Sequence, residues 1–99
     1  MRFEDHVRRA LDALPPEIAA KLENVAVVVE DEDRDDPDLF GVFESHPYLP
    51  DKITIFRLPL AESFPDPAEL EREIRVTVLH ELGHYFGMDE GQLDDLGLG

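Results

Sequence analysis

The chain has 99 residues, enough for one domain, and 42% of them are hydrophobic, which suffices for a single packed core. The 24 acidic and 9 basic residues give a formal net charge of −15, which disfavours binding to nucleic acid or to an anionic membrane surface. The sequence contains no cysteine, and this excludes disulfides, thiolate metal sites and cysteine nucleophiles. Because it also lacks a long apolar run and an apolar leader, we expect one cytoplasmic domain spanning residues 1–99.

Two helices are predicted at the start of the chain. Residues 3–14 carry the apolar stripe of an amphipathic helix, formed by Phe3, Val7, Ala10, Leu11 and Leu14. Two prolines follow, and Pro16 suits the first turn of a second short helix that reaches Leu22. His6 lies on the first helix and is interpreted as a surface residue.

Three strands are predicted in the middle of the chain. Residues 25–29 form an unbroken apolar run, typical of a strand that is covered on both faces and lies near the middle of a sheet. Residues 39–43 and 52–57 are the second and third strands, and the proline-containing segment 45–51 between them is a predicted loop. Residues 59–64 can hold a helical turn.

An acidic segment, residues 30–38, separates the first two strands and holds seven carboxylates. Mutual repulsion and the lack of apolar anchors favour a solvated loop. A calcium site is disfavoured because the glycine and the terminal glutamate of an EF-hand loop are missing. The role of this acidic loop stays open.

The last long element has clear start and stop signals. Asp66 is a candidate N-cap, Pro67 fits the first helical position, and Glu69 completes a capping box. The helix is predicted to end at Phe86, because Gly87 can adopt the left-handed backbone conformation that commonly terminates a helix. A final turn with Leu93, Leu96 and Leu98 is expected to pack back onto the body. The order α-α-β-β-β-(α)-α predicts an α+β domain with the helices on one side of a short sheet.

This helix contains the spacing H-E-x-x-H, from His80 to His84. The two imidazoles lie one turn apart, about 40° around the axis, and can bind one metal ion. Glu81 is about 100° away from His80, too far to join as a ligand but able to reach a water on the open side of the metal. Zinc lowers the pKa of a bound water to about 7, so this arrangement predicts metal-assisted hydrolysis with Glu81 as the general base.

A third ligand is expected after the sharp turn at Gly87. Glu90 lies three residues further on and is the favoured candidate, while Asp89 is the competing one. A site with only the two histidines is the remaining alternative. We expect no ligand from a later helix, since the sequence ends at Gly99.

The residues around the motif allow further predictions. The face that His80 and His84 share also carries polar Glu73 and Thr77, which favours metal binding over a purely structural role. Glu73 or the acidic loop could orient a zinc-bound histidine through its second ring nitrogen. Candidates for stabilising an oxyanion are Tyr85, Tyr48 and His46.

Residues 76–90, VTVLHELGHYFGMDE, resemble the signature of the short bacterial zincin-like proteins called minimal metalloprotease-like. Residues 25–30 and 49–57 resemble strands of the same family. The resemblance implies a minimal zincin-like fold, with a small three-stranded sheet packed on the long motif helix plus N-terminal helices, and zinc as the metal. It also implies peptidase activity, with His80, His84 and the acid after Gly87 as ligands and Glu81 as the general base. The family usually has aspartate where this chain has Glu90.

The leading hypothesis for function is a zinc-dependent peptidase that holds a peptide or protein substrate along a sheet edge, formed by residues 39–43 or 53–56. The alternative is a non-catalytic, zincin-derived binding module, in which the metal is structural or absent and the acidic surface holds a basic partner. Hydrolysis of a non-peptide amide or ester would use the same residues. The cleavage specificity and the oligomeric state are not predicted.

Overall fold

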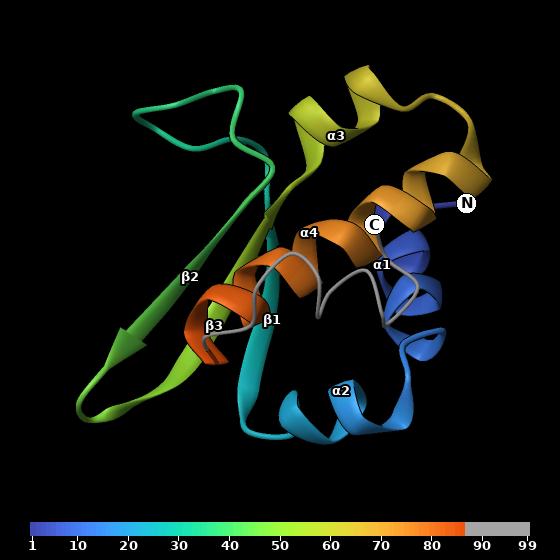
Figure 1. Cartoon of the computed structure of the whole chain (residues 1–99). Helices are drawn as coiled ribbons and strands as arrows, with labels where there is room; N and C mark the ends of the chain where they lie inside the picture. Colours follow the sequence, from blue (N-terminus) through green and yellow to red (C-terminus); the bar gives the residue numbers. More distant parts are fainter. Residues whose placement is uncertain (87–99) are drawn as a thin grey trace.

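The computed structural model describes the backbone of residues 1–86 and the side chains of residues 1–83. Its helices and strands follow the predicted order, and the fold is α+β (Figure 1). The elements in chain order are α1 (Phe3–Asp12), α2 (Pro16–Lys21), β1 (Val25–Glu30), β2 (Gly41–His46), β3 (Leu49–Phe56), α3 (Arg57–Ser63) and α4 (Pro67–Phe86). None of the helices in this described part has the length and apolar character of a membrane span.

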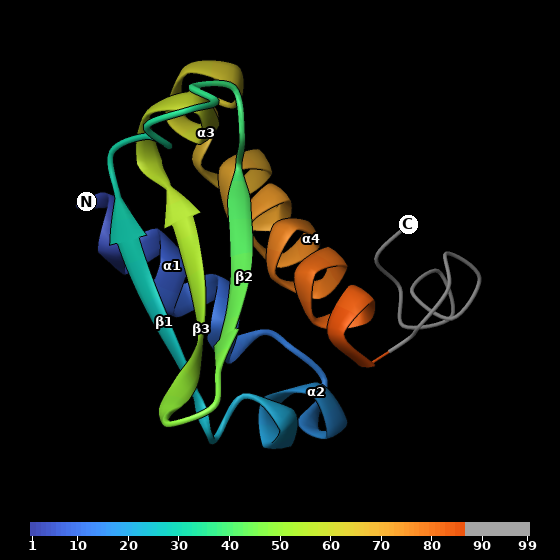
Figure 2. The ribbon, with the colours of Figure 1, turned by 90° about the vertical axis from the view of Figure 1, so that its left-hand side faces the viewer.

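The sheet has the strand order β1-β3-β2, with β1 parallel and β2 antiparallel to β3 (Figure 2). The prediction that residues 25–29 lie near the middle of the sheet is therefore wrong, since β1 is an edge strand and β3 is the central one. Ala26 is exposed, so β1 is not covered on both faces. Its valines satisfy the general preference of β-branched residues for strands, which does not depend on a central position.

β2 and β3 form a hairpin whose connection is Pro47 and Tyr48. The predicted loop over residues 45–51 is thus mostly strand. The register shifts between Glu44 and His46, and β1 pairing begins only at Asp51 of β3. Pro50 lies within this irregular stretch, between the paired residues Leu49 and Lys52, and irregularities of this kind are where strands tolerate a proline.

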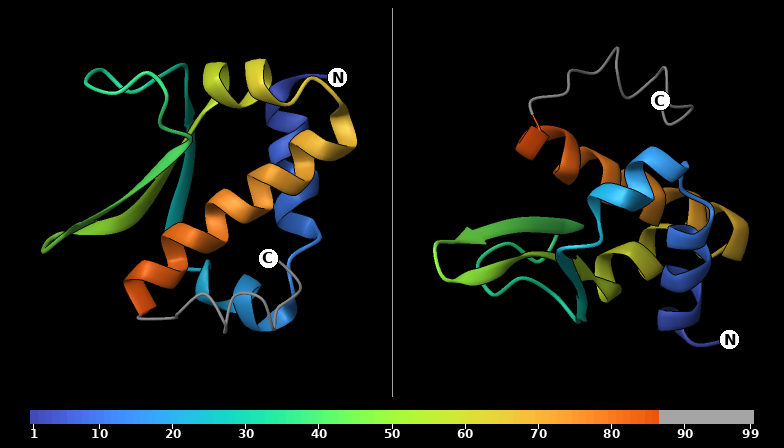
Figure 3. Two further views of the ribbon diagram at one scale, coloured as in Figure 1. Left: turned by 45° about the horizontal axis from the view of Figure 1, so that its top comes forward. Right: turned by 90° about the horizontal axis from the view of Figure 1, so that it is seen from below.

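The helices α1, α2 and α4 lie on one side of the sheet, as predicted (Figures 1 and 3). The core fills the space between the sheet and these helices, and Ile53 and Ile55 of the central strand are fully buried in it. α4 crosses this core with a buried stripe made up of Leu70, Ile74, Val78, Leu79 and Leu82. The motif helix is therefore fixed on the sheet by its apolar side.

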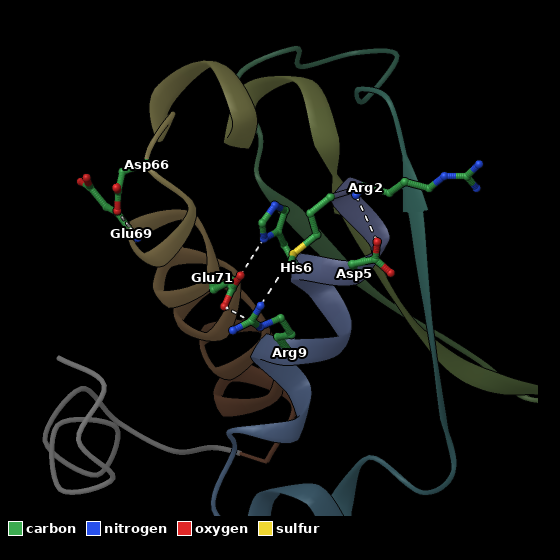
Figure 4. A network of polar contacts seen from close by, with 8 residues as sticks. Arg2, Asp5, His6, Arg9, Asp66, Glu69 and Glu71 are labelled. Atoms are coloured by element: carbon green, nitrogen blue, oxygen red, sulfur yellow. Dashed lines mark hydrogen bonds and ion pairs between the residues drawn. The ribbon is translucent and has the colours of Figure 1, made fainter.

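The start of α4 is fixed by a side-chain cap. The backbone N–H of Glu69 donates to Oδ2 of Asp66 at 3.0 Å, and that of Leu70 donates to the Asp66 carbonyl at 2.8 Å (Figure 4). The predicted cap and the predicted first residue, Pro67, are confirmed. The cap satisfies backbone N–H groups of the first turn and so stabilises the helix that carries the motif.

His6 is not a surface residue, so this prediction is wrong. Its exposed fraction is 9%, and Nδ1 lies 2.6 Å from Oε2 of Glu71 on α4 (Figure 4). Nε of Arg9 lies 3.5 Å from the other oxygen of the same carboxylate. The partner of His6 is 65 positions away in the chain, and no local pattern reveals such a contact.

Candidate active site

His80 and Glu81 lie near the C-terminal end of α4, and both side chains are half-buried. The flanking Leu79 and Leu82 are each 1% exposed and belong to the core. Because side chains turn by about 100° per residue around a helix, anchoring these two leucines directs His80 and Glu81 away from the core. The buried stripe thus decides which way the motif faces.

β2 approaches this part of α4 very closely at its first residue, Gly41. A Cβ at this position would lie 2.7 Å from Cγ2 of Thr77, 3.1 Å from the Thr54 carbonyl oxygen and 4.0 Å from Cγ of Glu81. Only glycine fits without displacing a neighbour. The hydroxyl of Thr77 donates to the Glu73 carbonyl at 2.8 Å, which fixes the side chain that Gly41 meets.

A groove of about 330 Å³ opens beside the motif, and His80 and Glu81 line it together. The other lining residues are Asp36, Asp38, Leu39, Phe40, Gly41 and Thr77. One wall therefore comes from α4, and the other from the end of the acidic loop and the start of β2. This volume is at the small end of the roughly 300–1,000 Å³ typical of ligand sites.

The edge strand beside the groove is β2. β3 is bonded to a strand on each side, so the prediction that residues 53–56 offer a free sheet edge is wrong. β2 is bonded only to β3 within the described sheet, and its first residue lines the groove. Figure 2 shows β2 as the strand nearest to the C-terminal half of α4.

The remaining predicted ligands are only partly placed. His84 follows His80 by one turn of α4, but its side chain lies outside the described residues, as do Gly87, Asp89 and Glu90. Among the side chains of residues 1–83, no three histidine or carboxylate groups come together as a metal site. Within the described part, the imidazole of His80 lines the open groove. This arrangement fits a catalytic metal, which needs room for a bound water.

Outside the acidic loop, none of the residues predicted to assist the metal ligands or to stabilise an oxyanion lines the groove, as far as their side chains are described. The carboxylate of Glu73 lies 3.3 Å from Nη1 of Arg72, and it does not line the groove. Tyr48 is 97% exposed at the hairpin turn, and His46 lies 3.4 Å from Glu44, so neither is brought to the motif. The side chain of Tyr85 lies outside the described residues, and so does the predicted final turn with Leu93, Leu96 and Leu98.

The acidic loop is the feature whose place the sequence leaves open. Asp36 and Asp38 come from this loop, about 40 residues before the motif, and reach the groove only through the tertiary fold. A larger hollow of about 620 Å³ lies at the first half of the loop, and no motif residue lines it. The groove at the motif is therefore the candidate active site.

The family model of zincin-like metallopeptidases matches residues 22–99. The chain belongs to this family. The match begins just before β1 and includes all the residues that line the groove, whereas α1 and α2 precede it. The family is one of metallopeptidases, and zinc is the metal that zincins bind. No curated protein matches the chain at a significant level.

Proposed function

We propose that this zincin-like protein is a zinc-dependent peptidase in which Glu81 is the general base. The observation that carries the proposal is the groove in which His80 and Glu81 meet the edge strand β2. A peptidase needs a metal ligand, a proton acceptor and a means of aligning an extended chain, and this groove combines residues suited to each of these tasks.

His80, His84 and Glu90 are the proposed metal ligands, with Asp89 as the alternative to Glu90. Two histidines one turn apart on a helix can hold one ion from the same side, and a carboxylate after the helix would complete a three-ligand site. Zinc bound there would polarise the scissile carbonyl and lower the pKa of its water to about 7.

Glu81 is proposed to move the proton. Its half-buried carboxylate accepts a proton from the attacking water and can then deliver it to the leaving amine. The helix positions Glu81 about 100° away from His80, which keeps the carboxylate out of the ligand set but within reach of the water.

The substrate is proposed to bind as an additional strand beside β2. An extended peptide can bond to the backbone groups that β2 does not use in pairing with β3. Because Gly41 lets β2 pack directly against Thr77, a peptide on this edge runs past Glu81 at the start of the strand. Edge pairing uses backbone groups, so it supports cleavage of many sequences.

The direct test is the Glu81→Gln variant, loaded with zinc and assayed on a library of quenched fluorescent peptides. We expect hydrolysis to fall by at least about 100-fold, in line with the loss of a general base, while the bound zinc stays at one per chain. Glu69→Gln is the matched control, because Glu69 is an exposed glutamate in the first turn of the same helix. Parent-like activity in Glu81→Gln would refute the proposal.

The ligands are tested separately by zinc content. His80→Ala and His84→Ala are each expected to lose the metal, and Glu90→Gln should weaken zinc binding more than Asp89→Asn does. Bound zinc without any chelator-sensitive cleavage in the parent would instead support the non-catalytic binding module.

A further inference from the structure

We propose that Asp36 and Asp38 make this site selective for peptides with a lysine or arginine side chain next to the scissile bond. The inference rests on the proposed peptidase function and adds the substrate class to it. Its basis is that both aspartates line the same groove as His80 and Glu81. A substrate residue flanking a bond cleaved at Glu81 therefore meets these two carboxylates.

Among the residues that the structure describes, no basic side chain neutralises the charges of the two aspartates. Oδ1 of Asp36 accepts from the backbone N–H of Asp38 at 3.1 Å, and neither carboxylate forms an ion pair with a basic residue in the described part of the chain. Both residues are exposed. Two uncompensated negative charges on one wall attract a cationic side chain and repel an acidic one.

The apolar residues between the aspartates and β2 suit the same kind of side chain. Leu39 and Phe40 line the groove next to Asp38, and both are half-buried. Lysine and arginine have long hydrocarbon stems that pack on apolar surface while the charged head reaches a polar partner. The groove thus offers a surface for the stem and carboxylates for the head.

The segment that carries the two aspartates, residues 31–40, is held in place at both ends. At its start, Nη2 of Arg57 lies 2.8 Å from Oδ1 of Asp31, and the N–H of Leu58 donates to the Asp31 carbonyl at 2.9 Å. At its end, the Phe40 ring packs edge-on against Phe64 with the centroids 5.8 Å apart.

Within the wall, Oδ1 of Asp33 accepts two backbone N–H groups, those of Asp35 and Asp36, both at 2.9 Å. These turns are closed by the loop's own carboxylates, so the backbone that carries Asp36 and Asp38 is set before a substrate arrives. A preformed wall loses less conformational entropy when it binds a ligand, and this increases affinity.

The test uses three quenched peptides that differ only at the residue flanking the cleaved bond, which is lysine, norleucine or glutamate. For the parent we expect kcat/KM to be about tenfold higher for the lysine peptide than for the norleucine peptide, as two partly exposed ion pairs would give. The Asp36→Asn/Asp38→Asn variant should lose this preference, so that its kcat/KM values for the lysine and norleucine peptides become equal. Asparagine retains the oxygen that closes the turn at residue 36.

The matched control is Asp12→Asn/Glu17→Gln, which changes the net charge equally at two exposed residues outside the groove. It should keep the tenfold preference. A parent without charge preference, a preference that survives in the Asp36→Asn/Asp38→Asn variant, or a loss of zinc from that variant would overturn the inference. Raising the salt concentration should reduce the preference.

Failure of the proposed function is distinguished by measuring binding. The affinity of the three peptides for zinc-loaded Glu81→Gln protein is compared by fluorescence anisotropy, with and without the two asparagine substitutions. A lysine preference that depends on Asp36 and Asp38, in a parent that cleaves nothing, would support the charge selection and refute the peptidase. Cleavage with no lysine preference in either assay would support the peptidase and refute the charge selection.

Discussion

Replacing Gly41 by alanine tests the packing that brings β2 to the motif helix. The new Cβ would lie 2.7 Å from Cγ2 of Thr77, whereas carbon atoms normally meet at about 3.5–4.0 Å, so roughly 1 Å of overlap must be relieved. Two movements can relieve it. Either Thr77 rotates away from Gly41, or β2 moves away from α4.

Both movements cost free energy of unfolding. Rotation of Thr77 breaks the hydrogen bond between its hydroxyl and the Glu73 carbonyl, worth about 0.5–1.5 kcal/mol. Displacement of the strand also strains the 3.1 Å approach to the Thr54 carbonyl, and overpacking of this kind costs about 1–3 kcal/mol. We therefore expect a destabilisation of about 2 kcal/mol, which lowers Tm by about 8–16 °C in a domain of this size.

The assay is urea and thermal unfolding of Gly41→Ala in the parent and in a Thr77→Ser background. Serine removes Cγ2 but keeps the hydroxyl, so the alanine should cost about 1 kcal/mol less there, and the difference is the coupling between the two sites. A cost below about 0.5 kcal/mol in the parent, or an equal cost in both backgrounds, would refute the proposed close contact.

Three further predictions concern the helix that carries the motif. Asp66→Ala removes the N-cap of α4 and should cost about 1 kcal/mol in thermal unfolding, while Asp66→Asn, which still caps, should cost clearly less; equal losses would contradict the cap. His6→Ala leaves the mostly buried carboxylate of Glu71 with Arg9 as its remaining ion-pair partner among the described residues, and it should lower the free energy of unfolding by about 1–3 kcal/mol. In the His6→Ala background, Glu71→Gln should cause little further loss. Additive losses would show that the two residues do not interact. Zinc at about 100 times its Kd should stabilise the protein by about 2.7 kcal/mol, a gain that a chelator removes and that His80→Ala never shows; a Tm insensitive to zinc would contradict metal binding by the folded state.

Within the candidate site, the sequence predicted what depends on local geometry. The spacing of His80 and Glu81 fixes their angular relation on any helix. The sequence did not predict that the acidic loop forms the opposite wall of the groove. This juxtaposition is set by the pairing of β2 with β3, which local patterns of charge do not encode.

The sequence by itself determined the start of α4 at Pro67 and the order of the elements, because caps, prolines and helical periodicity act between residues a few positions apart. Only the tertiary structure decided that β1 lies at the sheet edge, that His6 meets Glu71, and that Gly41 must be a glycine. These features join segments far apart in the chain, and which of the competing long-range pairings forms depends on the packing free energy of the whole core rather than on any one segment.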